Sequence, residues 1–262
     1  MFRKIVQKIP LQKVVVLGVE GALITSRVLP LCRTLEKLER DRSVKGVVLL
    51  VDSPGGTAPA SEYLYFAVRR VRKVKPVISC VIFGASGGYL AACGGEKVYA
   101  LPTAIVGSIG VISFKPVLAG VMERVGVSLE VVKKGEKKDM SLFHRGYSED
   151  ERKSLEALHS AVYGRFVSIV SEERHLPREK VEEIATGELF SAETALSLGL
   201  VDAVGDLEKF VTEFASSLGV KRERVVYHRP RKHFMRRLVS SGAEALVDEF
   251  FRFFPFGGTW GK

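Results

Sequence analysis

The stretch KGVVLLVDSPGG, residues 45–56, decides the fold class of this chain. Its first half is a continuous apolar run, typical of a strand buried on both faces, and its second half is a turn containing proline and glycine. Two similar apolar runs flank it, KVVVLGVEG at 13–21 and PVISCVIF at 76–83. The first third of the chain is therefore predicted to contain buried strands.

Helical segments separate these predicted strands. PLCRTLEKLERD at 30–41 carries Leu31, Leu35 and Leu38 at helical spacing. ASEYLYFAVRRVRKV at 60–74 ends in basic residues, which the helix dipole favours at a C-terminus. Strands that alternate with helices build a parallel sheet covered on both faces, so we predict an α/β fold of this kind.

The second half of the chain is predicted to be largely helical. The stretch at 148–174 opens on Ser148, a favourable N-cap residue, and three acidic residues follow it in the first turn. Two shorter helices are predicted at 176–187 and 191–199, each closed by a glycine. No internal repeat or low-complexity linker interrupts this pattern.

Most of the net charge of +10 lies near the C-terminus, where residues 221–237 hold eight Lys/Arg and one Glu. A charge gathered in one segment argues against a nucleic-acid surface spread over the fold. From residue 233 apolar residues recur at spacings of three and four, which indicates an amphipathic helix. We assign 1–220 to one domain and 221–262 to a basic linker and this C-terminal helical extension. The helix packs on its own domain or on a neighbouring subunit, or it makes a peripheral contact with an anionic membrane surface.

Composition excludes several classes of protein. The 262 residues, 46% of them apolar, suit one large domain. No run reaches the roughly 18 apolar residues that cross a bilayer, and the opening MFRKIVQKIP lacks the apolar core of a signal peptide. The three cysteines and five histidines show no ligand spacing, so we predict neither a metal nor another cofactor. We expect a cytoplasmic protein. If it associates with a membrane, we expect it at the inner face.

Three glycine-bearing turns follow predicted strands: DSPGG at 52–56, GASGG at 84–88 and VGSIGV at 106–111. In a parallel sheet, ligand chemistry gathers at the carboxyl ends of strands. Glycine lets a backbone N–H approach a substrate carbonyl, as an oxyanion hole requires. Ser86, in the second turn, is therefore either a nucleophile or a small residue at a tight turn.

A serine nucleophile needs a base to accept its proton. The candidates are His144 and four lysines that follow a strand-like run, Lys133, Lys134, Lys137 and Lys138. A lysine base must be neutral, and lowering its ordinary pKa of about 10.4 by about three pH units disfavours the ammonium by about 4 kcal/mol. Spacing alone leaves the choice among these lysines open, and such a cluster is otherwise a solvated loop.

Taken in order, the motifs resemble the signal peptide peptidase A (protease IV) family of Ser-Lys serine peptidases, which has the Clp-protease/crotonase fold. The matching stretches are VDSPGG at 51–56, ASGGY at 85–89, GSIGV at 107–111, KKGEKKD at 133–139, and the closing stretch 187–202. The likeness runs from about Val14 to Gly205. Any one of these motifs is weak evidence, whereas their common order is specific.

The resemblance implies a role for each of five residues. Ser86 is the nucleophile and Lys138 the general base; Gly56 and Gly87 hold the oxyanion through backbone N–H groups, and Ser108 orients the lysine. It further implies an acyl-enzyme intermediate and peptide substrates, which are remnants of signal peptides or other hydrophobic peptides. The resemblance also implies a homo-oligomeric ring, in which the serine and the lysine of one site can come from neighbouring subunits.

Two other functions share this fold. A crotonase-type acyl-CoA enzyme uses carboxylates for acid–base work, and the acids near predicted strand ends, Glu20, Asp52 and Glu62, form no evident pair in the sequence. A catalytically inactive scaffold subunit is the second alternative. The presence of both Ser86 and Lys138 argues against it.

Overall fold

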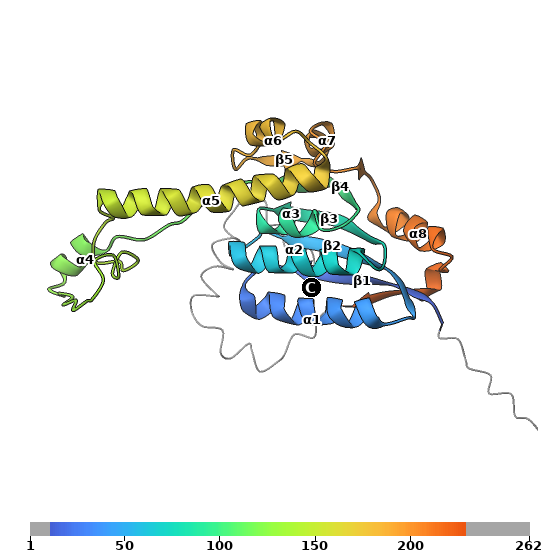
Figure 1. Cartoon of the computed structure of the whole chain (residues 1–262), viewed down its shortest axis with the longest axis horizontal. Helices are drawn as coiled ribbons and strands as arrows, with labels where there is room; N and C mark the ends of the chain where they lie inside the picture. Colours follow the sequence, from blue (N-terminus) through green and yellow to red (C-terminus); the bar gives the residue numbers. More distant parts are fainter. Residues whose placement is uncertain (1–10, 229–262) are drawn as a thin grey trace, which may run out of the picture. The chain divides into compact units, whose positions relative to one another are not determined.

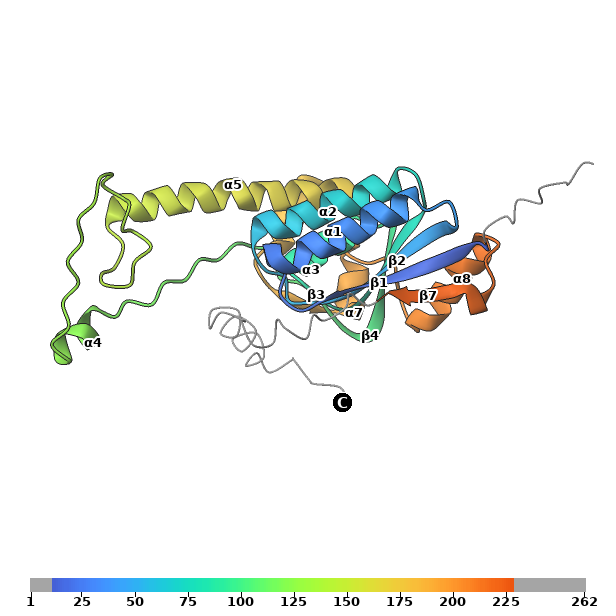
Figure 2. The same ribbon diagram turned by 90° about the horizontal axis from the view of Figure 1, so that it is seen from below.

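The computed structural model describes residues 11–228 of the chain (Figures 1 and 2). These residues divide into two compact units. Unit 1 holds the residues up to Ile109 and those from Val167 onward, and unit 2 is Gly110–Phe166. The predicted amphipathic helix from residue 233 onward lies outside the described residues, so it stays a prediction.

A mostly parallel sheet forms the centre of unit 1. Its central strands are β1 (Lys13–Glu20), β2 (Val44–Ser53), β3 (Val77–Ala85) and β4 (Lys97–Gly107), all parallel and in the spatial order β4-β3-β2-β1. At the edges, β7 (Val225–His228) pairs in parallel with β1, β5 (Leu189–Ser191) pairs antiparallel with β4, and β6 (Ala203–Val204) pairs in parallel with β4. The continuous apolar runs in the sequence are thus buried strands, and the predicted α/β fold is confirmed.

Helices cover both faces of this sheet, as Figure 2 shows for α1 and α2 on one side and α8 on the other. In unit 1 they are α1 (Thr25–Arg40), α2 (Ala58–Arg72), α3 (Gly87–Ala92), α6 (Arg178–Ile184), α7 (Ala192–Ser197), α8 (Leu207–Ser217) and the short 3-10 turn η1 (Arg222–Arg224). The contact with α8 is apolar: Leu207, Val211 and Ala215 pack against Val14, Val16, Val48, Ile78 and Cys80. Burial of these side chains is the main stabilising contribution to the packing of helices on the sheet.

Helix α1 begins earlier than the sequence indicates, at Thr25 instead of Pro30. The carbonyl of Ile24 accepts hydrogen bonds from Arg27 and Val28, both at 3.0 Å, so the helix is established before the proline. Pro30 then lies inside the helix, where its ring removes one backbone donor. Pro30 is the sixth residue of the helix, beyond the first turn, so the helix continues through it at the cost of one i→i−4 hydrogen bond.

The sheet also extends past the predicted domain boundary at residue 220. Residues 222–224 form η1, and Val225–His228 add strand β7 beside β1. The first part of the segment assigned to a basic linker therefore belongs to the sheet.

Unit 2 contains α4 (Ala119–Arg124) and the first part of α5 (Glu149–Arg174), which ends in unit 1. The residues 127–132, expected to form a strand before the lysines, are irregular. The apolar pattern was right for a strand, but a strand also needs a partner for its backbone hydrogen bonds, and unit 2 has no other strand within 110–166. Val132 is consequently 95% exposed.

Within residues 11–228, none of the helices combines the length and the apolar character that crossing a lipid bilayer requires.

A buried tyrosine joins α3 to a distant part of unit 1. The hydroxyl of Tyr89 donates a hydrogen bond of 2.8 Å to the carbonyl of Leu200, and the Tyr89 side chain is fully buried. Burial raises the pKa of Tyr89 well above its ordinary value, so the phenol stays neutral and keeps its proton for this bond.

Replacing Tyr89 with Phe removes this donor and leaves a buried carbonyl without its partner. We expect the free energy of unfolding, measured by urea denaturation of the full chain, to fall by about 1–3 kcal/mol. Tyr63, which is 46% exposed, provides the matched control, and Tyr63→Phe should change stability by less than about 0.5 kcal/mol. Equal stabilities for Tyr89→Phe and the unaltered chain would contradict a stabilising role for this hydrogen bond.

Candidate active site

The three glycine-bearing turns lie at one edge of the sheet in unit 1. The ends of β2, β3 and β4 are in register: Ser53 pairs with Gly84, and Ala85 pairs with Gly107. The backbone N–H of Ser86 donates a 2.8 Å hydrogen bond to the carbonyl of Gly107. Because the strands are parallel, their carboxyl ends bring together turns that are far apart in the sequence.

Ser86 occupies an unusual backbone conformation at the sharp change from β3 to α3. Its φ of 50° and ψ of −123° lie in a region that residues with a side chain rarely adopt. Such strain persists where the surroundings fix it, and it is common in turns that present a nucleophile. Ser86 is half-buried, and within residues 11–228 its hydroxyl makes no hydrogen bond, so it is free to react.

The DSPGG turn packs directly against Ser86. Gly55 has a φ of 92°, and a Cβ atom placed on it would lie 2.6 Å from the nitrogen of Gly87 and 2.9 Å from the Cβ of Ser86. A side chain at this position is therefore excluded by space as well as by backbone conformation. The close contact between two backbones places the DSPGG turn, which contains Gly56, next to Ser86 and Gly87.

Gly56 and Gly87 each present a backbone N–H that donates no hydrogen bond to any other described residue. Neither position has room for a side chain: a Cβ on Gly56 would lie 2.2 Å from the carbonyl oxygen of Leu23, and one on Gly87 would lie 2.0 Å from Oγ of Ser61. Two free N–H groups beside a free hydroxyl are the arrangement that an oxyanion hole requires.

Ser53 is a positioning residue that the sequence did not single out. Its fully buried hydroxyl donates to the carbonyl of Gly21 at 2.7 Å and accepts from the N–H of Gly55 at 3.1 Å. It therefore ties the DSPGG turn to the end of β1. A serine in a glycine-rich turn is the only signal in the sequence, and it does not distinguish this role from an ordinary turn residue.

Ser108 lies in the same region as Ser86. It follows Gly107, whose carbonyl holds the Ser86 N–H, and it also has a positive φ, of 51°. Its own N–H donates to the carbonyl of Glu188 at 2.6 Å, which fixes the turn to the segment before β5. Unit 1 thus brings together four of the five predicted site residues: Ser86, Gly56, Gly87 and Ser108.

Lys138, the fifth, belongs to unit 2. Among the four candidate lysines, Lys133 pairs with Asp139 at 2.6 Å and Lys137 pairs with Asp150 at 2.5 Å. An ion pair stabilises the protonated amine, which cannot act as a base. Lys134 and Lys138 make no ion pair within the described residues, so the ion pairs reduce four candidates to two.

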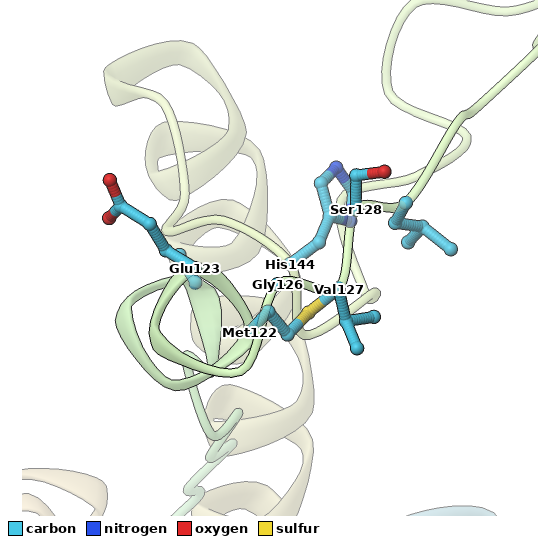
Figure 3. A pocket seen from close by; sticks show the side chains of 8 residues that line it. Met122, Glu123, Gly126, Val127, Ser128 and His144 are labelled. Atoms are coloured by element: carbon cyan, nitrogen blue, oxygen red, sulfur yellow. The ribbon is translucent and has the colours of Figure 1, made fainter.

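His144, the histidine candidate, also lies in unit 2. Its Nε2 is 3.5 Å from Oδ2 of Asp139, and the residue lines a pocket of about 410 Å³. Figure 3 shows this pocket between Met122 and Glu123 of α4, the turn at Gly126, and His144. All its lining residues lie in unit 2, and none of them is at the end of a strand.

Two carboxylates lie at the ends of β1 and β2. Glu20 and Asp52 are register partners on adjacent parallel strands, so they form the pair that was not evident in the sequence. Burial raises the pKa of the Asp52 carboxyl, and the nearby charge of Glu20 adds to this effect. Within residues 11–228, no cluster of three or more His, Cys, Asp or Glu side chains could hold a metal ion.

Comparison with known proteins finds a family match and several relatives. Residues 69–221 match the family described as "Peptidase family S49". A protein of Synechocystis, provisionally named a protease, is 36% identical over 208 residues, which cover 79% of this chain and 74% of the relative. A protein of Enterococcus faecium, provisionally named signal peptide peptidase SppA, is 34% identical over 65% of this chain and 50% of the relative. Protease 4 of Haemophilus influenzae is 31% identical over 82% of this chain, which spans 36% of that protein.

The tight fit of Gly56 leads to a prediction about stability. Gly56→Ala places a methyl group against the backbone of Leu23, which cannot move without disturbing the bridge between the two residues. We expect the free energy of unfolding to fall by about 1–3 kcal/mol in urea denaturation. Gly120→Ala in α4 is the matched control, because a Cβ there meets nothing within 4 Å, and its stability should be unchanged or slightly higher. Equal stabilities for the two variants would show that the turn has room to spare.

Proposed function

The chain belongs to peptidase family S49, and we propose that it is a serine endopeptidase in which Ser86 is the nucleophile and Lys138 the general base. The observation that carries the proposal is the free hydroxyl of Ser86 on a strained turn, beside the unpaired N–H groups of Gly56 and Gly87. The hydroxyl and the two N–H groups supply two components of acyl transfer, a nucleophile and an oxyanion hole. The third component, a base, comes from Lys138.

The reaction follows from these roles. Neutral Lys138 accepts the proton of Ser86 as its Oγ attacks the scissile carbonyl carbon, and the backbone N–H groups of Gly56 and Gly87 bind the resulting oxyanion. When the tetrahedral intermediate collapses, the C–N bond breaks and the lysine returns the proton to the leaving amine. The acyl-enzyme is then hydrolysed by water that the same lysine deprotonates. The Ser108 hydroxyl orients the lysine amine by a hydrogen bond.

We propose extended, apolar peptides as substrates, either remnants of signal peptides or other hydrophobic peptides. The relative in Enterococcus faecium carries the name of a signal peptide peptidase, which supports this class. Ser86 is only half-buried and Gly56 is exposed, so this part of the turn can be reached from solvent. We propose that a peptide bound there presents its scissile carbonyl to the N–H groups of Gly56 and Gly87.

We also propose that the chains assemble as a homo-oligomeric ring. Unit 2 lies wholly within the described residues, and its buried side chains are those of Asp139, Glu151 and Phe166. Its exposed large apolar residues include Ile112, Phe114, Val117, Val121, Val125, Val127, Val132 and Leu158. A segment with so little apolar core of its own is stabilised by burying these side chains against a neighbour. In such a ring, Lys138 of one subunit meets Ser86 of the next.

A crotonase-type acyl-CoA enzyme is the second candidate, because the pair of Glu20 and Asp52 could supply acid–base groups. The free hydroxyl of Ser86 favours the peptidase, because crotonase-type chemistry does not use a serine nucleophile. Hydrolysis or isomerisation of acyl-CoA thioesters by the purified chain, in the absence of peptidase activity, would reverse this preference. A scaffold subunit would show neither activity.

Two substitutions test the catalytic pair. Ser86→Ala removes the nucleophile and Lys138→Ala removes the base, so each should lower the initial rate on a fluorogenic apolar peptide by about 1,000-fold or more. Lys134→Ala is the matched control, because Lys134 is the other lysine without an ion pair, and it should keep most of the activity. Full activity in Ser86→Ala would disprove the proposed nucleophile. Loss of activity in Lys134→Ala but not in Lys138→Ala would identify Lys134 as the base instead.

Mixed assemblies test the shared site. Co-expressing Ser86→Ala with Lys138→Ala should restore about a quarter of the unaltered activity, which is the share of intact serine–lysine contacts that random mixing leaves in a ring. Light scattering should give a mass several times the 28.8 kDa of one chain. A monomeric mass would contradict the ring, and an inactive mixture in a confirmed oligomer would place both residues of a site in one subunit.

A further inference from the structure

Two of the three buried side chains of unit 2 are charged. Asp139 is 5% exposed and Glu151 is 3% exposed, although both are charged residues. A buried carboxylate is costly unless it is paired and hydrogen-bonded, so each must have a partner. Both have the same one, Arg145, which lies between them.

Arg145 uses its guanidinium to bind both carboxylates at once. Its Nε and Nη2 donate to Oδ2 and Oδ1 of Asp139 at 3.2 and 2.8 Å. Its Nη1 and Nη2 donate to Oε2 and Oε1 of Glu151 at 2.8 and 2.7 Å. The planar fork of arginine allows two bidentate contacts of this kind, whereas the single ammonium of lysine does not.

Glu151 anchors this cluster to the start of α5. Its Oε2 accepts the N–H of Ser148 at 2.8 Å, and its own N–H donates to the Ser148 hydroxyl at 3.2 Å. The two residues form a reciprocal capping box, which confirms Ser148 as the N-cap. Asp139 is thereby connected through Arg145 to the first turn of a long helix. Asp139 directly follows Lys138, so the helix also fixes the backbone next to the proposed base.

The contacts of Asp139 also determine whether its carboxylate can pair with the neighbouring Lys138 amine. Lys133 binds Oδ1 of Asp139 at 2.6 Å, and Nε2 of His144 lies 3.5 Å from Oδ2, so both carboxylate oxygens are occupied. The Arg145 guanidinium holds the pKa of Asp139 well below its usual range and lowers that of Glu151 to about 2, so both remain ionised. A free carboxylate beside Lys138 would stabilise its ammonium form and oppose its use as a base.

We propose that Arg145 is a positioning residue for the base: it fixes the Lys138 loop to α5 and keeps the Asp139 carboxylate away from the Lys138 amine. This inference rests on the proposed peptidase function. Without Arg145, Asp139 keeps only its contacts with Lys133 and His144 and can turn toward Lys138, and the base then becomes neutral only at higher pH. A residue that served stability alone would change the amount of folded protein but not the pH at which the base loses its proton.

The test is the pH dependence of kcat for Arg145→Met in the full chain, with folding checked by circular dichroism and thermal unfolding. We expect kcat at neutral pH to fall about tenfold or more, because misplacement of a catalytic group by about 1 Å can cost about 100-fold. The midpoint of the rise in activity should move upward by about one pH unit. Arg145→Lys should recover part of the rate, since it can still bind one carboxylate.

Arg152→Met is the matched control, because Arg152 is an exposed arginine on the same helix, and its kinetics should be unchanged. If Arg145→Met does not fold, Glu151→Gln gives a second readout: it weakens the attachment of Arg145 to α5 and should lower kcat, whereas the pH midpoint should stay because Arg145 still holds Asp139. An unchanged kcat and pH profile in a folded Arg145→Met or Glu151→Gln chain would overturn the inference while leaving the peptidase intact. Activity that persists in Lys138→Ala would instead refute the proposed base, and the role of Arg145 with it.

Discussion

The close approach of two backbones, that of Gly55 and that of Ser86 and Gly87, is the constraint on which the candidate site depends. A Cβ atom on Gly55 would lie 2.6 Å from the Gly87 nitrogen, so the two turns can meet only where no side chain separates them. The in-register ends of β2, β3 and β4 bring the turns to this distance, and the hydrogen bond from Ser86 to Gly107 fixes the third turn beside them. The positive φ of Ser86 is tolerated because the surrounding contacts, with Gly55 on one side and Gly107 on the other, fix the backbone in this conformation.

The two units are stabilised in different ways, and this difference suits their proposed tasks. Unit 1 has an apolar core in which strands and helices bury large side chains, and such packing holds backbone atoms to within fractions of an ångström. An oxyanion hole needs that precision. Unit 2 instead buries two carboxylates around one arginine. Ionic contacts of this kind set the direction and the charge of a few side chains, which is what a lysine base needs.

The sequence predicted most of the fold and four residues that the structure brings together at the candidate site; their catalytic roles stay a prediction. Continuous apolar runs identify buried parallel strands reliably, because burial on both faces leaves no polar face to interrupt them. The ordered motifs then identified Ser86, Gly56, Gly87 and Ser108, which the structure brings together in unit 1. Features that depend on partners were not predictable. Residues 127–132 have the pattern of a strand but no neighbour to pair with, and the pairing of Glu20 with Asp52 follows from register, which a sequence does not state.

The division of the proposed catalytic pair between two units has a consequence for when the chain is reactive. Among the described residues of unit 1 no side chain binds the Ser86 hydroxyl, and Lys138, in unit 2, is exposed. On the proposed mechanism, the serine lacks its base in this state. If a neighbouring subunit supplies the lysine, the contact that brings the amine to the serine also removes it from water, and desolvation favours the neutral form. The same burial would cover apolar side chains of unit 2, so the free energy of association would offset the cost of neutralising the lysine. On this proposal, peptidase activity arises only in the assembled particle, and a chain that has not yet assembled cannot cleave other proteins.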